Sequence, residues 1–561
     1  MDSPLVSRLF RQLFRHPACQ PRRNFARLAS SLQQAQASRP SRQQPHSARQ
    51  AQAPASAQVR GYAAAPRGGG GRMTRSNESD WQQRTDMFPE DMSAEYAEYP
   101  MVTAQELRQR RERPRRVKML MRDFIEDSLY NPHYGYFSKQ VVIFSPGNEP
   151  FAFNEMRDEP AFHEALGQRY SEFEDQLDAE AVAQGGEPSD TRQLWYTPTE
   201  LFRPYYGEAI ARSLVDNYML NSFPYHDLII YEMGAGRGTL MLNILDYLRA
   251  NEPAVYERTR YKIIEISSNL AALQKRQLTV GNQGRGHHHH HHQQPPPKSG
   301  EAAAADGSSE VASAAAARGH AGRVEIINQS IFDWTATEPS PCFFLAFEVF
   351  DNFAHDCLRY DLATEQPLQG VVLLAANGDM YEFYEPQLDP EAARFLRVRD
   401  AATQGRYPLP YPSSRLLRTL KHSLLPFAPN LSAPEYVPTR LMAFFDVLAR
   451  HFPAHRLLTS DFHSLPDTIA GLNAPIVQTR FQRRPVPVST PLVHQGYFDI
   501  MFPTDFRVVE AMYRAITGKP ARVVSHEQFM RHWADIDATR TRSGENPLLS
   551  WYANASVLST V

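Results

Sequence analysis

Residues 228–240 place an apolar strand, a glycine-rich turn and an amphipathic helix in immediate succession. The apolar run 228–231 leads into Glu232-Met-Gly-Ala-Gly-Arg-Gly-Thr, and the helix expected over 238–250 is apolar on one face. Glycines allow a tight turn and let the backbone approach a ligand that any Cβ would exclude. This order is typical of the first β-α unit of a parallel sheet that binds a cofactor at the carboxyl ends of its strands.

The same grammar continues along the chain. Further strands are expected at 261–266, 323–327, 342–348, 371–376, 456–460 and 476–481, with helices at 206–220, 268–279, 439–451, 506–516 and 525–534. Alternation of strands and helices predicts an α/β fold with a doubly wound parallel sheet. We therefore expect a Rossmann-like sheet with an N-terminal helical extension and insertions.

Three acidic residues near the predicted strand ends favour S-adenosylmethionine as the cofactor. The loop glycines Gly234, Gly236 and Gly238 alternate, whereas a dinucleotide site would want a further glycine where Thr239 stands. Glu232 precedes the first glycine and suits the cationic amino-acid end of this cofactor. Glu265 ends the next strand, where a carboxylate can accept hydrogen bonds from ribose hydroxyls.

Asp333, after the third strand, is the candidate contact for the adenine amine. The simpler alternatives are that Glu265 is a surface charge and that Asp333 caps a helix. An NAD-dependent oxidoreductase is a further alternative, which Thr239 disfavours.

Glu348 and Asp351 are the candidate catalytic residues. Glu348 ends the apolar strand 342–348, at the edge where open α/β sheets bind ligands, and Asp351 follows three residues later. Carboxylates at this edge can hold a substrate group by hydrogen bonds and accept a proton from it. Alternatively, both side chains cap the following helix.

Five regions are expected along the chain: a mitochondrial presequence (1–62), a disordered linker (63–116), an N-terminal helical, substrate-covering region (117–225) with an insertion at 145–192, the Rossmann-like methyltransferase domain (226–540), and a C-terminal tail (541–561). Arginines alternate with apolar residues near the start, and no Asp or Glu occurs between Ser3 and Asn77. Arg60-Gly-Tyr62-Ala resembles a matrix-processing site. The alternative is a disordered basic tail for nucleic acid.

Charge and composition limit the kinds of partner and site that the chain can have. Residues 1–62 hold ten Arg and one Asp, so the chain without them has a formal net charge of about −11, which disfavours general nucleic-acid binding. No apolar run reaches the roughly 18 residues that a membrane-spanning helix needs. Three Cys without CxxC spacing indicate neither a disulfide framework nor a zinc site.

A low-complexity insertion is expected at 282–320, within the methyltransferase domain. It contains six consecutive His at 287–292 together with Pro and Ala runs, and it offers little apolar area to bury. A metal-binding loop is the alternative. We expect no metal cofactor.

Several motifs together resemble the mitochondrial complex I assembly-factor protein arginine methyltransferases and their bacterial MidA-like relatives. The resemblance covers residues 117–537 and rests on Leu129-Tyr-Asn-Pro-His-Tyr-Gly-Tyr-Phe137, residues 197–200, Tyr206-Gly-Glu208, residues 232–240, Ile264-Glu-Ile-Ser267, Leu345-Ala-Phe-Glu-Val-Phe-Asp351, Asp499-Ile500 and Thr504-Asp-Phe506.

This resemblance implies symmetric (type II) dimethylation of an arginine on a core complex I subunit, with S-adenosylmethionine as methyl donor, in the mitochondrial matrix. The alternative is an assembly chaperone of the same fold that binds a subunit without turnover.

Overall fold

The computed structural model describes residues 90–147, 149–267, 271, 319–412, 414 and 430–561. The expected presequence, the helix expected at 268–279 apart from residue 271, and residues 282–318 of the expected insertion lie outside the described residues.

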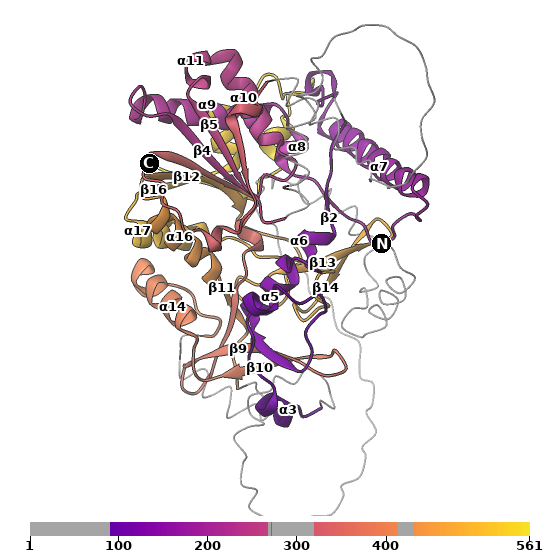
Figure 1. Ribbon diagram of the computed structural model, residues 1–561, viewed down its shortest axis with the longest axis vertical. Helices are drawn as coiled ribbons and strands as arrows, with labels where there is room; N and C mark the ends of the chain where they lie inside the picture. The colour runs from indigo at the N-terminus through magenta and orange to yellow at the C-terminus, as the bar shows by residue number, and fades with distance from the viewer. Residues whose placement is uncertain (1–89, 148, 268–270, 272–318, 413, 415–429) are drawn as a thin grey trace, which may run out of the picture. The chain divides into compact units, whose positions relative to one another are not determined.

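A seven-stranded sheet forms the centre of the described part (Figure 1). Its spatial order is β16-β17-β12-β7-β4-β5-β6. The strands are β4 (Leu228–Met233), β5 (Thr259–Ile264), β6 (Val324–Ile327), β7 (Cys342–Phe347), β12 (His455–Phe462), β16 (Ala521–Ser525) and β17 (Ala555–Thr560). Strands β12, β7, β4, β5 and β6 pair in parallel, so the predicted Rossmann-like sheet is confirmed.

The last strand corrects the expectation of a C-terminal tail. Residues 555–560 form β17, which inserts between β12 and β16 and runs antiparallel to both. Numbered along the chain, the sheet therefore reads 3-2-1-4-5-7-6, whereas a dinucleotide-binding sheet ends 4-5-6. Leu558 is fully buried in this strand, and removing its apolar side chain from water stabilises the strand within the sheet.

Two helical layers cover the sheet (Figure 1). One apolar core lies beneath α9 (Tyr205–Asn221), α10 (Thr239–Asn251) and α18 (His526–Trp533). A second core on the other face includes residues of α14 (Pro390–Thr403), α16 (Thr439–His451) and α17 (Phe506–Thr517). Apolar side chains that alternate along the buried strands supply both cores, as expected for a sheet covered on two sides.

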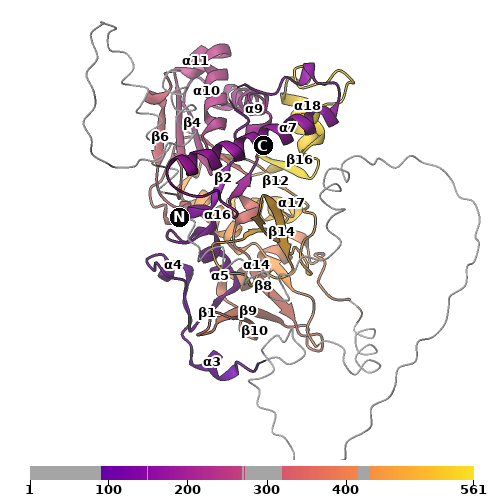
Figure 2. The ribbon, with the colours of Figure 1, turned by 90° about the vertical axis from the view of Figure 1, so that its right-hand side faces the viewer.

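Within the described part of the chain, three smaller sheets accompany the main one. A five-stranded antiparallel sheet contains β1 (Val117–Leu120), β8 (Asp356–Tyr360), β9 (Pro367–Leu374), β10 (Met380–Glu385) and β11 (Glu435–Val437). A three-stranded sheet contains β13 (Ile476–Phe481), β14 (Arg484–Val488) and β15 (Asp499–Met501), and β2 (Val141–Ile143) pairs with β3 (Gln193–Trp195). The strands expected at 371–376 and 476–481 therefore belong to separate sheets. Figure 2 shows β1, β9 and β10 together, away from β4.

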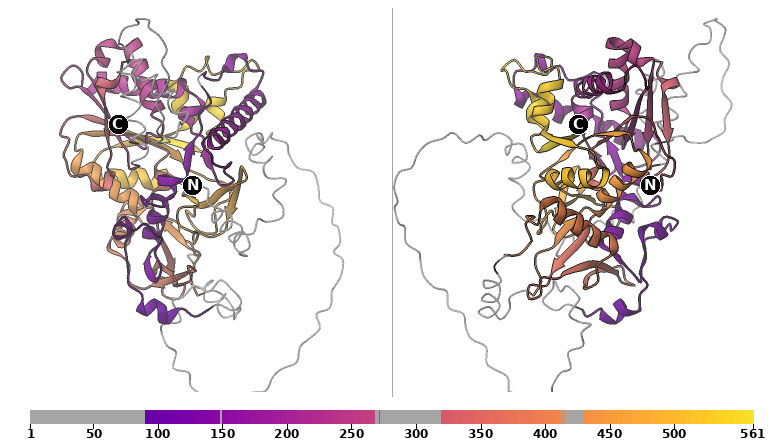
Figure 3. Two further views of the ribbon diagram at one scale, coloured as in Figure 1. Left: turned by 45° about the vertical axis from the view of Figure 1, so that its right-hand side comes forward. Right: turned by 90° about the vertical axis from the view of Figure 1, so that its left-hand side faces the viewer.

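The remaining helices and turns lie mostly in the residues before the first strand of the main sheet. These are α3 (Ser93–Glu98), α4 (Ala104–Leu107), α5 (Met121–Tyr130), α6 (Tyr136–Lys139), α7 (Glu159–Ala183), α8 (Pro198–Leu201), α11 (Pro253–Tyr256), α19 (Pro547–Ser550), and the 3-10 turns η3 (Phe153–Glu155), η4 (Ala321–Arg323), η5 (Ile331–Asp333) and η6 (Phe350–Asn352). The long helix α7 within the expected insertion stands outside the main sheet (Figure 3). Arg480 of β13 holds it through a buried ion pair with Glu174 at 3.0 Å.

The expected disorder of residues 63–116 is wrong for its described part. Thr103 and Glu106 form a capping box at the start of α4, and Leu107 is fully buried. The cap satisfies backbone donors and the burial of Leu107 removes apolar surface from water, so this short segment packs despite its charged neighbours. No helix in the described ranges is both long and apolar enough to cross a membrane.

Candidate active site

The glycine-rich turn after β4 depends on its glycines for conformation and for space. Gly234, Gly236 and Gly238 have φ angles of +75°, +52° and +77°, in the left-handed region that side chains disfavour. A Cβ on Gly236 would lie 2.7 Å from Cδ1 of Ile143, and one on Gly234 would lie 3.1 Å from Cγ2 of Val349. The turn is thus covered by β2 on one side and by the loop after β7 on the other.

Two of the predicted cofactor carboxylates lie at neighbouring strand ends. Glu232 is buried on β4 and its Oε2 accepts a hydrogen bond from Tyr261 Oη at 2.7 Å. Burial, with Glu265 nearby, raises the pKa of Glu232 to about 7 despite this hydrogen bond. Glu265 follows β5, is buried, and its Oε1 accepts from the Ser267 N–H at 2.8 Å.

Asp333 is engaged by the N-terminal segment. It ends η5, and its Oδ2 lies 2.7 Å from Nη1 of Arg108, in an ion pair that is partly exposed on both sides. An adenine amine would have to share this carboxylate with Arg108. Contact between Asp333 and adenine therefore stays a prediction, as do the cofactor roles of Glu232, Glu265 and the loop glycines.

The loop after β7 carries both predicted catalytic residues in an unusual conformation. Glu348 has a φ of +53°, and its backbone N–H donates to the Ser460 carbonyl at 2.9 Å. Left-handed backbone at a residue with a side chain costs about 1–3 kcal/mol and concentrates at functional sites. Asp351, three residues on, is buried, and its Oδ1 has no hydrogen-bond partner.

Two further acidic residues meet these side chains. Asp461 of β12 follows the register pair Phe347–Ser460, so it lies beside Glu348. Its Oδ2 accepts hydrogen bonds from three consecutive N–H groups, those of Val349, Phe350 and Asp351, at 3.1, 2.7 and 3.4 Å. Asp499 of β15 is buried and accepts from Asn352 Nδ2 at 3.0 Å.

Glu348, Asp351, Asp461 and Asp499 form what we call the carboxylate cluster. Burial and the Asp461 charge raise the pKa of Glu348 well above its usual range, and burial together with the three other carboxylates does the same to Asp351. Burial raises the pKa of Asp461 to about 6 and that of Asp499 to about 7. A cation bound among these carboxylates would lower their pKa values again and favour the ionised forms.

The carboxylate cluster does not have the arrangement of a metal site. Within the described ranges, no three His, Cys, Asp or Glu side chains are grouped so that they could hold a metal ion. The Asp461 carboxylate is instead committed to backbone N–H groups, as in a cap, and orients the loop after β7. Glu348 and Asp351 remain available to an organic cation.

Two buried tyrosines lie near Glu348. Burial and then the charge of Glu348 raise the pKa values of Tyr206 and Tyr552. The Tyr552 hydroxyl is buried without a hydrogen-bond partner. Tyr134 and Tyr136, two aromatic residues of the motif at 129–137, are buried: Tyr134 donates to Asp127, and Tyr136 accepts from Trp195.

The sequence patterns did not point to Asp461 or Tyr552, which lie near Glu348 in the structure. Asp461 could have been found, because it directly follows the expected strand 456–460 and so belongs to the same carboxyl edge as Glu348. Tyr552 could not, because it lies in the segment expected to be a tail, and only β17 returns that segment to the sheet.

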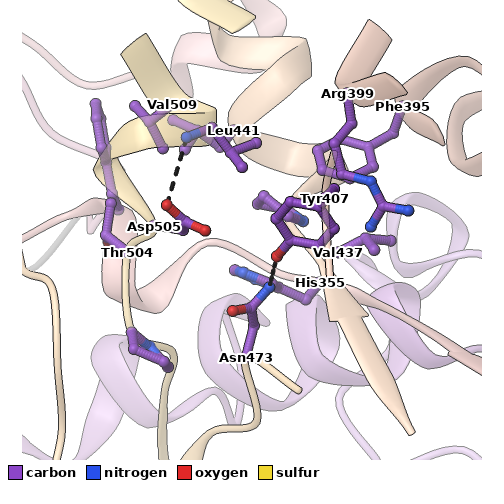
Figure 4. Close-up of a pocket in the computed structure, with 14 residues that line it drawn as sticks. His355, Phe395, Arg399, Tyr407, Val437, Leu441, Asn473, Thr504, Asp505 and Val509 are labelled. Atoms are coloured by element: carbon purple, nitrogen blue, oxygen red, sulfur yellow. Dashed lines mark hydrogen bonds between the residues drawn. The ribbon is translucent and has the colours of Figure 1, made fainter. Parts of the chain in front are cut away.

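A separate pocket is lined by residues of α14, α16 and α17, among them Phe395, Leu441 and Val509 (Figure 4). Its one buried cation, Arg399, is paired with the buried Glu435 and lies over the ring of Tyr407 at 4.3 Å. His355 is neutral there, because burial lowers its pKa to about 3. These charges are already satisfied, so we do not assign this pocket to the cofactor.

The sheet order and the glycine turn after its first strand are those of a Rossmann-like class I methyltransferase fold. Residues 209–524 match the family described as "Putative S-adenosyl-L-methionine-dependent methyltransferase". The chain belongs to this family, and S-adenosylmethionine is its cofactor.

The chain is also similar to individual proteins and solved structures. The chain is 25% identical, over 431 residues, to "Protein arginine methyltransferase NDUFAF7 homolog, mitochondrial" of Schizosaccharomyces pombe, which covers 74% of this chain and 80% of that protein. A Burkholderia thailandensis protein crystallised with S-adenosyl-homocysteine is 15% identical, with a TM-score of 0.45, over 79% of this chain and 87% of its own. A native crystal structure from the same organism, also 15% identical, gives a TM-score of 0.39 over 74% and 95%.

Proposed function

We propose that this methyltransferase acts on the guanidinium group of an arginine in a protein substrate. The observation that carries the proposal is the carboxylate cluster at the end of β7, with an unpartnered buried oxygen on Asp351. Val349, between Glu348 and Asp351, lies against Gly234 of the cofactor turn. The cluster therefore adjoins the turn that is expected to hold the methyl donor.

The chemistry of guanidinium explains why carboxylates belong here. Bound S-adenosylmethionine supplies an electrophilic methyl group. Arginine is protonated at neutral pH, so one nitrogen must be made more nucleophilic and a proton must leave after methylation. Ionised Glu348 would hold two N–H groups of the guanidinium and localise its charge on them, which frees the third nitrogen for in-line attack. A cluster carboxylate then accepts the proton.

The finer assignments follow from the resemblance and from the name of the S. pombe relative. We infer that the methylated protein is a core subunit of complex I, that the product is symmetric dimethylarginine, and that the reaction takes place in the mitochondrial matrix. The arginine-rich, acid-free residues 3–77 support import. The relative is named a mitochondrial protein arginine methyltransferase.

The decisive experiment is single-turnover methylation of a purified complex I core subunit, read by mass spectrometry. Glu348→Gln keeps the size of the side chain but removes its charge, and the rate should fall about 10²- to 10³-fold. S-adenosyl-homocysteine binding, measured by calorimetry, should be nearly unchanged. The matched control is Glu382→Gln, which removes another carboxylate with a raised pKa, in β10 of the five-stranded sheet.

Wild-type turnover in Glu348→Gln would remove the catalytic role, and lost cofactor affinity would place Glu348 in the cofactor site instead. If wild-type protein binds the subunit and the cofactor but methylates no arginine, the chain is an assembly chaperone. Mass spectrometry also distinguishes symmetric from asymmetric dimethylarginine, which tests the proposed product.

A further inference from the structure

The strand order indicates where each end of the cofactor lies. Strand β4 stands between β5 and β7, so Glu265 and Glu348 lie on opposite sides of the glycine turn. With the ribose toward Glu265 and the methyl group toward Glu348, the amino-acid end lies over the turn and the start of α10. This end is a zwitterion, with one ammonium and one carboxylate group.

Glu200 brings a buried carboxylate to this place. It lies on α8, is 2% exposed, and its Oε1 accepts a hydrogen bond from Oγ1 of Thr239, the first residue of α10, at 2.5 Å. Its Oε2 is buried and has no hydrogen-bond partner. Nη1 of Arg203 lies 3.9 Å from that oxygen, too far for a hydrogen bond, and Arg203 also donates to the Gly147 carbonyl.

Arg237 brings the complementary charge. It stands between Gly236 and Gly238 in the turn itself, and its Nε is buried without a hydrogen-bond partner. Burial raises the pKa of Glu200, and the Thr239 hydrogen bond and the charges of Arg237 and Arg203 oppose this rise, so Arg237 is close to Glu200. An unpartnered acceptor and an unpartnered donor, both buried, are costly unless a ligand satisfies them.

Glu232, which the sequence suggests for the amino-acid end, is less suited to it. Its Oε2 is taken by Tyr261, and it lies near the second carboxylate Glu265 rather than near a cation. Glu200 and Arg237 instead present one charge of each sign, as a zwitterion requires.

We propose that Glu200 and Arg237 bind the amino-acid end of S-adenosylmethionine: Oε2 of Glu200 accepts a hydrogen bond from the ammonium group, and the guanidinium of Arg237 donates to the carboxylate. Thr239 positions Glu200 for this contact. The proposal concerns cofactor binding alone and does not depend on which substrate is methylated.

Two ligands that differ only at this end test the proposal. S-adenosyl-homocysteine carries the amino acid, whereas 5′-methylthioadenosine keeps the adenosine and the sulfur but lacks it. Calorimetric titration of the full chain should show that Glu200→Gln and Arg237→Gln each weaken S-adenosyl-homocysteine about 10- to 100-fold, as for loss of a hydrogen bond between charged groups. Affinity for 5′-methylthioadenosine should stay within about threefold.

The control is Arg249→Gln, which removes an arginine from the last turn of α10 and should change neither affinity. Arg237 is only partly buried, so Arg237→Gln decides the matter if Glu200→Gln does not fold. Equal weakening of both ligands would mean that the two residues only shape the turn, and unchanged affinity for both would mean that they do not meet the cofactor. Either result overturns the proposal.

Discussion

Position 236 requires glycine for two reasons: its backbone has a positive φ, and a side chain there would reduce the space for a ligand above the turn. Valine there would have to adopt a φ of +52° and place its Cβ 2.7 Å from Cδ1 of Ile143. Ile143 can move, but then both side chains occupy the space above the turn. We expect Gly236→Val to lower S-adenosyl-homocysteine affinity at least tenfold in calorimetry.

The matched control for this change is Gly518→Val. Gly518 also has a positive φ, +70°, but an added Cβ meets nothing within 4 Å. Both variants bear backbone strain of about 1–3 kcal/mol, and only Gly236→Val obstructs the turn. Equal cofactor affinity in the two variants would contradict the assignment of the glycine turn.

The raised pKa of Asp499 predicts how the free energy of unfolding depends on pH. Its pKa is about 7 in the folded chain against about 3.8 unfolded, so the folded state holds a proton that the unfolded state loses between these values. The free energy of unfolding of the wild type should therefore decrease as pH rises through this window. Asp499→Asn removes the ionisable group and keeps an oxygen that can accept from Asn352.

The variant should match the wild type near pH 4 and become more stable above about pH 7, by up to about 4 kcal/mol at 1.4 kcal/mol per pKa unit. Thermal unfolding of both proteins from pH 4 to pH 9 measures the difference. If the difference in stability between the two proteins is constant, or grows toward low pH, then burial does not raise the pKa of Asp499.

Among the elements, β17 does most to distinguish this sheet from a dinucleotide-binding one. Its side chains enter both apolar cores, Val557 on one face and Leu558 on the other. We expect Leu558→Ala to lower the free energy of unfolding by about 2–5 kcal/mol, because it leaves a cavity beside β12. Urea unfolding followed by circular dichroism gives this value.

Val561→Ala is the control, because Val561 directly follows β17 and is 66% exposed. It should change stability by no more than about 0.5 kcal/mol. If Leu558→Ala were equally mild, β17 would contribute little to the sheet, and the C-terminal residues would behave as the tail that their position suggests.

Elements from distant parts of the chain also build the two sides of the candidate active site. Strand β2 covers the glycine turn through Ile143, and α8 carries Glu200 to the start of α10. On the other side, β12 and β15 bring Asp461 and Asp499 to the loop after β7.

At the scale of the whole molecule, the structure shows where the expected low-complexity insertion at 282–320 ends. Residues 282–318 lie outside the described residues, but His320 is fully buried and lies 2.7 Å from Tyr256 Oη and 3.0 Å from Asp246 Oδ1. The expected insertion therefore ends before His320. Its composition offers little apolar area to bury, and loop length costs only about 0.6 kcal/mol per doubling.

Replacing 282–318 with a short Gly-Ser linker should leave the melting temperature and the cofactor affinity nearly unchanged. Extending the deletion through His320 should lower the melting temperature, because it leaves the partners of a buried imidazole unsatisfied. Differential scanning calorimetry compares the two deletions. A loss of activity on treatment of the wild type with a metal chelator would instead favour a metal-binding role for the His run.

Much of the fold is local, and local patterns determined it. Apolar runs and helical spacing predict β4, α10, β7, α16 and α17 to within a few residues, because each element's pattern depends on which of its own faces is buried. The glycine turn and Glu348 could be placed in the same way, since both directly follow a recognisable strand.

Only the tertiary structure decided what meets at the site. Strand pairing between segments more than a hundred residues apart puts Asp461 beside Glu348, and β17 enters the sheet between strands that precede it in the chain. Burial then raises the pKa values of all four carboxylates in the cluster, and the charges of the neighbouring carboxylates add to the rise at Glu348 and Asp351. The periodicity of a sequence shows which face of an element is buried but not which element packs against it. The carboxylates of the site therefore come together only when the strands of the sheet have paired.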